Sequence, residues 1–175
     1  MVPQPVLRLE IGGGARGHLQ KNRPVLAVDA DHNMDFAFNL ANGNLPDMNH
    51  LGSALPDVLD YVGLSGDDKY TQAFLEETDA RFSFGKDFDE FTATYTHEVQ
   101  NNLHIMSSGP QTEKVLYGDA CSHVLSTPLK VYLPLLKLDN RGVVVMDEKA
   151  GADGASTGIV TGVDVGVIVV EPSVH

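Results

Sequence analysis

Continuous runs of aliphatic residues mark the strands that this sequence predicts. Three of these runs, at residues 25–28, 142–146 and 165–170, lack the alternation of apolar and polar positions that is typical of a half-exposed strand. An unbroken run is typical of a parallel strand buried on both faces. Residues 103–106 form a fourth predicted strand. The pattern therefore predicts a predominantly parallel sheet.

The segments between these runs favour helices. Residues 53–61 and 68–79 are predicted helices. The segment 126–138 has Pro128 at its first helical position, where a missing N–H is tolerated, and Pro134 further along, where we expect a kink. Strands and helices thus alternate along the chain, which predicts an α/β fold with helices flanking the sheet.

The size and charge of the chain narrow its class. A chain of 175 residues can bury one core, so we expect a single domain over residues 1–175, with residues 63–100 as an insertion or mobile face rather than core. The net charge of −12 disfavours nucleic acid and anionic membranes as partners. No apolar run is long enough to span a bilayer. One cysteine and no secretory signal are typical of a cytoplasmic protein.

Acidic residues follow two of the predicted strands. Asp29 and Asp31 come at the end of the first strand, and Asp147 comes at the end of the strand 142–146. Because α/β proteins bind ligands at the carboxyl ends of parallel strands, we expect Asp29 and Asp147 to emerge at the same edge of the sheet. Carboxylates there can hold the water shell of Mg²⁺ or orient a water toward a phosphate. The alternative is a solvated turn in which an aspartate caps the next helix.

The order of these segments resembles that of the MinD/ParA-like ATPases and the nitrogenase iron protein. Residues 25–33 (VLAVDADHN) are similar to the switch I strand of that class, and residues 143–151 (VVVMDEKAG) to its Walker B strand and switch II. Residues 165–173 (VGVIVVEPS) resemble the core strand that follows. Within the class, this succession, with a cysteine turn in the middle, is most similar to the CooC-type proteins that mature nickel enzymes.

This resemblance implies a P-loop NTPase-like fold that binds ATP and magnesium between the strand ends, often as a homodimer. It implies that Asp29 and Asp31 act on the attacking water and the metal shell, and that Asp147 holds magnesium through water. Gly151 would let the switch II backbone approach the γ-phosphate, because glycine lacks the Cβ that would block it. The implied partner is a metalloenzyme client such as carbon monoxide dehydrogenase.

The phosphate-binding loop of this class is altered here. The candidate loop, residues 11–17 (IGGGARG), has Arg16 where the phosphate lysine belongs. It keeps three glycines that would lie against the phosphates, Gly12, Gly13 and Gly14. Only residues 17–24 separate the loop from the next strand, and a parallel crossover through a helix needs more. We therefore expect poor ATP hydrolysis, and the alternative is an interaction domain that has lost ATP binding.

The end of the chain also departs from the class. The sequence stops at His175, directly after a predicted core strand, where the relatives continue with further strands and helices. We therefore expect an incomplete fold, as in a fragment or a shortened relative.

Cys121 and His123 form a candidate pair of metal ligands, placed in a turn ahead of the segment 126–138. A thiolate and an imidazole suit zinc or nickel, with the remaining ligands supplied by a second subunit. In CooC-type proteins the matching turn can carry two cysteines, and this chain has Asp119 at the first of those positions. The alternative is a buried thiol beside a capping histidine.

Overall fold

The main sheet of the computed structural model has four strands in the order β3-β4-β1-β6. The structure describes residues 23–64, 71–117, 122–139, 142–149, 159 and 163–167. The strands of this sheet are β1 (Val25–Asp29), β3 (His97–Gln100), β4 (Leu103–Ser107) and β6 (Val143–Asp147). β1 pairs in parallel with β4 and with β6, and β3 pairs antiparallel with β4. The predicted α/β fold with a mostly parallel sheet is confirmed.

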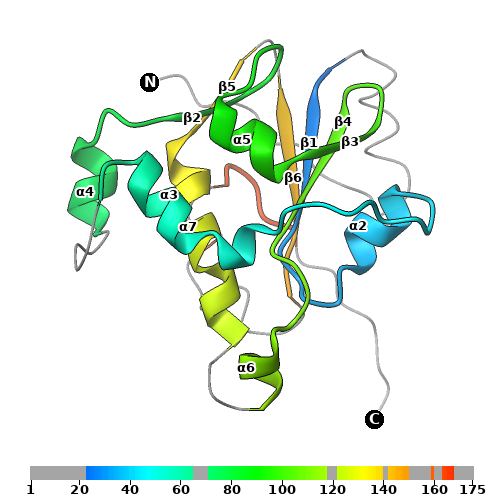
Figure 1. The fold of residues 1–175 in the computed structure, drawn as a ribbon. Helices are drawn as coiled ribbons and strands as arrows, with labels where there is room; N and C mark the ends of the chain where they lie inside the picture. Colours follow the sequence, from blue (N-terminus) through cyan, green and yellow to red (C-terminus); the bar gives the residue numbers. More distant parts are fainter. Residues whose placement is uncertain are drawn as a thin grey trace.

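Helices cover the sheet on both sides (Figure 1). On one side Val25 and Ala27 of β1 pack in a cluster with Ala37 of α2 (Asp35–Leu40). On the other side Leu26 and Val28 belong to a larger cluster that includes residues of α3 and α7. Alternate residues of β1 therefore enter two different cores, which is why the strand is apolar at every position before its last.

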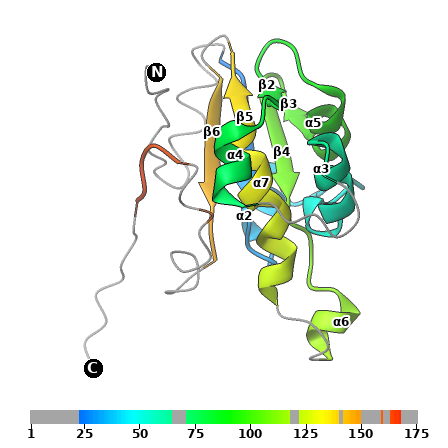
Figure 2. The same cartoon turned by 90° about the vertical axis from the view of Figure 1, so that its left-hand side faces the viewer.

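Apart from β1, the larger core is assembled from elements that follow α2 in the chain, as Figure 2 shows from the side. Its helices are α3 (Leu55–Tyr61), α4 (Gln72–Glu77), α5 (Glu90–Tyr95) and α7 (Thr127–Leu135). A second, two-stranded parallel sheet pairs β2 (Phe82–Phe84) with β5 (Leu136–Leu138). The remaining short elements are the 3₁₀ turns η1 (Leu51–Ser53) and η2 (Ser122–Ser126) and the helix α6 (Glu113–Leu116). None of the helices in the described part of the chain combines the length and apolar character needed to cross a membrane.

The predicted helices are present but shorter than expected. α3 and α4 lie within the segments 53–61 and 68–79, although residues 65–70 lie outside the described part of the chain. In the segment 126–138 the helix ends one residue after Pro134, and the chain continues directly into β5. A proline inside a helix removes one hydrogen bond and clashes with the preceding turn, so the helix stops here instead of kinking.

The predicted strand at residues 165–170 is wrong over its first part. Residues 165–167 are not in a strand, and residues 168–170 lie outside the described part of the chain. Val165 is 51% exposed and Val167 is 49% exposed. An apolar run is therefore not enough to predict a buried strand, because burial also needs a neighbouring strand on which to pair.

Part of the segment 63–100 belongs to the core, which corrects the expectation for its aromatic residues. Phe82 and Phe84 of β2 are fully buried, and Phe91 of α5 packs in the same cluster. The ring of Phe82 lies 4.7 Å from that of Tyr61 and 4.7 Å from that of Tyr132, measured between centroids. The division of the chain into domains stays a prediction.

A polar network ties this segment to α7. Asp89 caps α5, since its carboxylate accepts the backbone N–H of Thr92 at 2.8 Å and the Thr92 hydroxyl at 2.7 Å. The Thr92 hydroxyl is also 3.0 Å from the buried hydroxyl of Tyr132. Burial raises the pKa of Tyr132, so this phenol stays protonated.

We predict that Phe82→Ala lowers the free energy of unfolding by about 3–5 kcal/mol, because it empties a large, fully buried volume. The matched control is Phe38→Ala on α2, where the ring is 49% exposed and the expected change is about 0.5 kcal/mol or less. Urea denaturation followed by circular dichroism measures both. Equal losses in the two variants would contradict a core that includes β2.

Candidate functional site

The three parallel strands end together at one edge of the sheet. In the register of the sheet Asp29 pairs with Ser107 of β4 on one side and with Asp147 of β6 on the other. Beyond the strands, the N–H of Ser108 donates to the Asp29 carbonyl and the N–H of Ala30 donates to the Asp147 carbonyl, each at 2.9 Å. The prediction that Asp29 and Asp147 emerge at the same edge is confirmed.

Asp29 is the most deeply buried of the acidic residues at this edge, with none of its surface exposed. Its carboxylate accepts the backbone N–H of Asp31 at 3.1 Å and that of Ala37, in the first turn of α2, at 2.8 Å. Desolvation, together with the charges of Asp147 and Asp31, raises its pKa to about 6, against the two hydrogen bonds. The structure thus shows the capping arrangement that was the alternative interpretation, in a buried rather than a solvated turn.

Asp31, Asp147 and Glu148 form the partly exposed portion of the acidic edge. Burial, followed by the charges of Asp31 and Asp35, raises the pKa of Asp147. Burial also raises the pKa of Glu148 to about 7, with smaller contributions in the same direction from Asp147 and Asp31. The shifts share one cause: carboxylates that are partly removed from water and lie near one another favour the protonated form.

Glu148 was not among the residues singled out from the sequence. Its Oε2 is buried and has no hydrogen-bond partner. The signal was present, because Glu148 directly follows the acidic end of an apolar strand. What the sequence could not show is that the strand β6 leaves this side chain half-buried beside Asp31.

At the end of β4 the same edge carries uncharged residues, Ser107, Ser108 and Gly109. The Ser107 hydroxyl accepts the N–H of Gly109 at 2.9 Å, and the Ser108 carbonyl accepts the N–H of Gly52 at 3.1 Å. Gly109 has φ +83°, and a Cβ there would lie 2.6 Å from the Cβ of His50. The loop that carries His50 is therefore held tightly against the end of β4.

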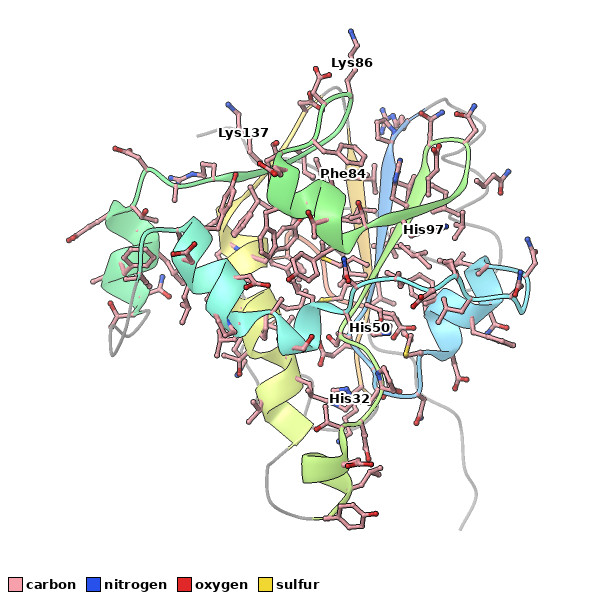
Figure 3. The ribbon with its side chains drawn as sticks, in the orientation of Figure 1. His32, His50, Phe84, Lys86, His97 and Lys137 are labelled. Atoms are coloured by element: carbon pink, nitrogen blue, oxygen red, sulfur yellow. The ribbon has the colours of Figure 1, made fainter. Side chains whose placement is uncertain are left out.

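Two histidines lie near this edge, whereas two lysines lie at the opposite end of the molecule (Figure 3). His32 follows β1 directly and is 8% exposed. Burial lowers the pKa of His50, although the charge of Asp47 opposes this shift, so His50 is mostly neutral at pH 7. Lys86 and Lys137 are at the far end of the view from His32. The carboxyl edge is therefore acidic, and the charge of Lys130 offsets part of the rise in the pKa of Glu148.

Most of the other predicted site residues lie outside the described part of the chain: Gly12, Gly13, Gly14, Arg16, Cys121 and Gly151. His123 lies in the 3₁₀ turn η2, and for His123 itself only the backbone is described. Their roles stay predictions.

The donor set at the edge suits magnesium better than zinc or nickel. Magnesium prefers carboxylate oxygens and keeps several waters, so one or two carboxylates and a phosphate suffice. Asp31 and Asp147 fit this requirement. Within the described residues no group of three or more histidine, cysteine, aspartate or glutamate side chains could enclose a metal ion.

The chain is similar to an uncharacterized ATP-binding protein of Methanocaldococcus jannaschii. The two sequences are 26% identical over 164 residues, which cover 91% of this chain and 59% of that protein. The chain therefore spans about three-fifths of the length of this relative. No family model matches the chain. No solved structure matches it either.

We predict that Gly109→Ala is more destabilising than Gly63→Ala. Both glycines have a positive φ, but a Cβ at Gly63 would meet nothing within 4 Å, whereas one at Gly109 would overlap His50. Strained backbone alone should lower the unfolding free energy by roughly 1 kcal/mol, and the overlap should bring the loss at Gly109 to about 2 kcal/mol or more. Denaturant titration of both variants measures the difference, and equal losses would show that His50 is not held against this loop.

We predict that the stability of the protein relative to its Glu148→Gln variant falls as pH rises from about 4 to 8. The folded state raises the pKa of Glu148 from 4.5 to about 7, so it binds this proton more tightly than the unfolded chain does. The stabilisation is complete below the unfolded pKa and is lost as pH rises through the folded value. Thermal unfolding of both proteins across this range measures the difference. A difference that does not change with pH would mean that Glu148 is solvated, and stability that rises with pH relative to the variant would mean that folding lowers its pKa.

Proposed function

We propose that this chain is a nucleotide-binding domain of the MinD/ParA-like class, which binds ATP with magnesium at the carboxyl edge of β4, β1 and β6. The observation that carries the proposal is the register that places the ends of these three strands, with Asp29 and Asp147, side by side. Open α/β sheets bind ligands at this edge. The similarity to an ATP-binding protein of M. jannaschii supports the choice of ligand.

In this proposal Asp31 and Asp147 hold the water shell of magnesium. The metal, when bound, offsets the negative charge that the carboxylates and the phosphates would otherwise bring together. The raised pKa of Asp147 fits a site where negative charges are crowded in the absence of a cation. Nucleotide binding should therefore depend strictly on magnesium.

The resemblance of the sequence motifs to the MinD/ParA-like class suggests a narrower function within that class. We place the chain nearest the CooC-type proteins, with carbon monoxide dehydrogenase or another metalloenzyme as client and a homodimer as the working form. Gly12, Gly13, Gly14 and Arg16 would contact the phosphates, and Gly151 would approach the γ-phosphate. Cys121 and His123 would bind zinc or nickel at the interface between subunits.

Hydrolysis should be slow even where binding occurs. Phosphoryl transfer depends on positioned positive charge around the γ-phosphate. The candidate phosphate loop has neither the signature lysine nor the hydroxyl that binds magnesium, since Arg16 and Gly17 stand in their places. An arginine does not reproduce the geometry of a lysine inside a tight loop of backbone donors.

We predict that isothermal titration detects ATP binding in the presence of Mg²⁺ and none in EDTA. Asp147→Asn should weaken the binding of ATP with Mg²⁺ by about tenfold or more, a change worth about 1.4 kcal/mol. Asp60→Asn, which removes one negative charge from an exposed position on α3, is the matched control and should leave binding unchanged. A phosphate-release assay on the same samples should show little turnover.

Three outcomes would count against the proposal. Equal weakening by the two substitutions would show that net charge, not the acidic edge, governs binding. Rapid turnover abolished by Asp147→Asn would show that the altered phosphate loop is functional. Lack of binding by the unmodified protein would favour the alternative, an interaction domain that has lost ATP binding.

A further inference from the structure

The side chain of Asp29 binds the backbone of its own connection to α2. Its Oδ1 accepts the N–H of Asp31 at 3.1 Å, and its Oδ2 accepts the N–H of Ala37 at 2.8 Å. Asp31 lies near the start of the connection, and Ala37 lies in the first turn of the helix. One carboxylate therefore holds both ends of the connection between β1 and α2.

The helix needs an acceptor at this position. The first N–H groups of a helix have no partner within it. Met34, at the N-cap of α2, has a left-handed backbone with φ 57° and makes no side-chain cap hydrogen bond. Because Ala37 is fully buried against the sheet, water cannot readily take the place of the missing cap. Asp29 supplies the acceptor from the end of the strand.

The connection held in this way carries Asp31. The N–H of Met34 donates to the Asp31 carbonyl at 3.2 Å, and the N–H of Ala30 donates to the Asp147 carbonyl at 2.9 Å. These bonds tie the connection to both α2 and β6. Asp31 and Asp147 are partly exposed, whereas Asp29 is fully buried. A ligand at this edge can therefore reach the first two carboxylates and not the third.

We propose that Asp29 is a positioning residue, which sets where Asp31 meets magnesium, and that it contacts neither the metal nor the attacking water. This inference rests on the proposed function, in which Asp31 and Asp147 hold the metal shell. It replaces the role that family resemblance implies for Asp29. Both oxygens of Asp29 are used by backbone donors, and turning either toward a ligand would leave a buried N–H without its acceptor.

Asp29→Asn tests the positioning role in the absence of any ligand. An amide offers one acceptor and one donor, so its NH₂ group would face one of the two backbone N–H groups. We expect hydrogen exchange at one of these two amides, that of Asp31 or that of Ala37, to become about tenfold faster or more, because it loses its acceptor. Asp31→Asn is the matched control, because it keeps the backbone N–H and should leave exchange at Ala37 unchanged. Unchanged exchange at both amides in Asp29→Asn would overturn the positioning role.

Titration with ATP distinguishes positioning from metal contact. Asp29→Asn should bind ATP more weakly than the unmodified protein, yet retain its dependence on Mg²⁺. Asp31→Asn should lose much of that dependence, because it removes a group that faces the metal. Loss of the Mg²⁺ dependence in Asp29→Asn, with exchange at the amides of Asp31 and Ala37 both unchanged, would mean that Asp29 contacts the metal and would overturn the inference.

A measurement on the unmodified protein keeps the test decisive where Asp29→Asn does not fold. On addition of Mg²⁺ alone, the ¹³C shifts of the Asp31 and Asp147 carboxyl carbons should change, and that of Asp29 should stay nearly constant. The largest change at Asp29 would overturn the inference. Absence of any change, together with absence of ATP binding, would overturn the proposed function, whereas the exchange rates of the Asp31 and Ala37 amides would still decide whether Asp29 holds the connection.

Discussion

The pairing of β1 on both of its edges is the constraint on which the rest of this structure depends. β4 and β6 are far from β1 in the sequence, yet each is held in parallel register with it along its whole length. Since helices also cover both faces, β1 is enclosed on four sides and tolerates only apolar side chains before its last residue. The position of its carboxyl end is therefore fixed by its neighbours, and this position in turn determines where the acidic edge lies.

The acidic edge opposes the stability of the fold that creates it. Burial and nearby negative charges raise the pKa values of Asp29, Asp147 and Glu148, so ionising these carboxyl groups costs more free energy in the folded protein than in the unfolded chain. At Asp29 two backbone hydrogen bonds offset part of this penalty. At Glu148 a backbone hydrogen bond from Lys149 and the charge of Lys130 offset part of the penalty, while its Oε2 is buried and has no hydrogen-bond partner. Such crowding of negative charge is what a cation-binding edge requires, and it fits the proposed magnesium site.

The larger core stabilises the positions of the strand ends, although it lies away from the acidic edge. The aromatic residues of β2 and α5 pack against α3 and α7, and the Asp89–Thr92–Tyr132 network links α5 to α7. These contacts cover the face of the sheet opposite α2. Because both faces are packed, the strand ends cannot shift independently of the helices, and the positions of Asp31 and Asp147 relative to each other follow from the whole core.

The sequence by itself determined the fold class, the strands β1, β4 and β6, and the shared edge of Asp29 and Asp147, because unbroken aliphatic runs report burial on both faces and parallel strands end together. Only the tertiary structure decided which carboxylates face outward. In the sequence Asp29 and Asp31 look alike, as two aspartates at the end of a strand. It is the approach of α2 that turns Asp29 inward, because the N–H of Ala37 has no acceptor within the helix and donates to the Asp29 carboxylate. Likewise, only packing brought Phe82 into the core and left Val165 exposed, because burial depends on neighbours distant in the chain. The hydrophobic pattern of a segment predicts its secondary structure. The residues that each side chain contacts depend on segments distant in the sequence, which the pattern does not specify.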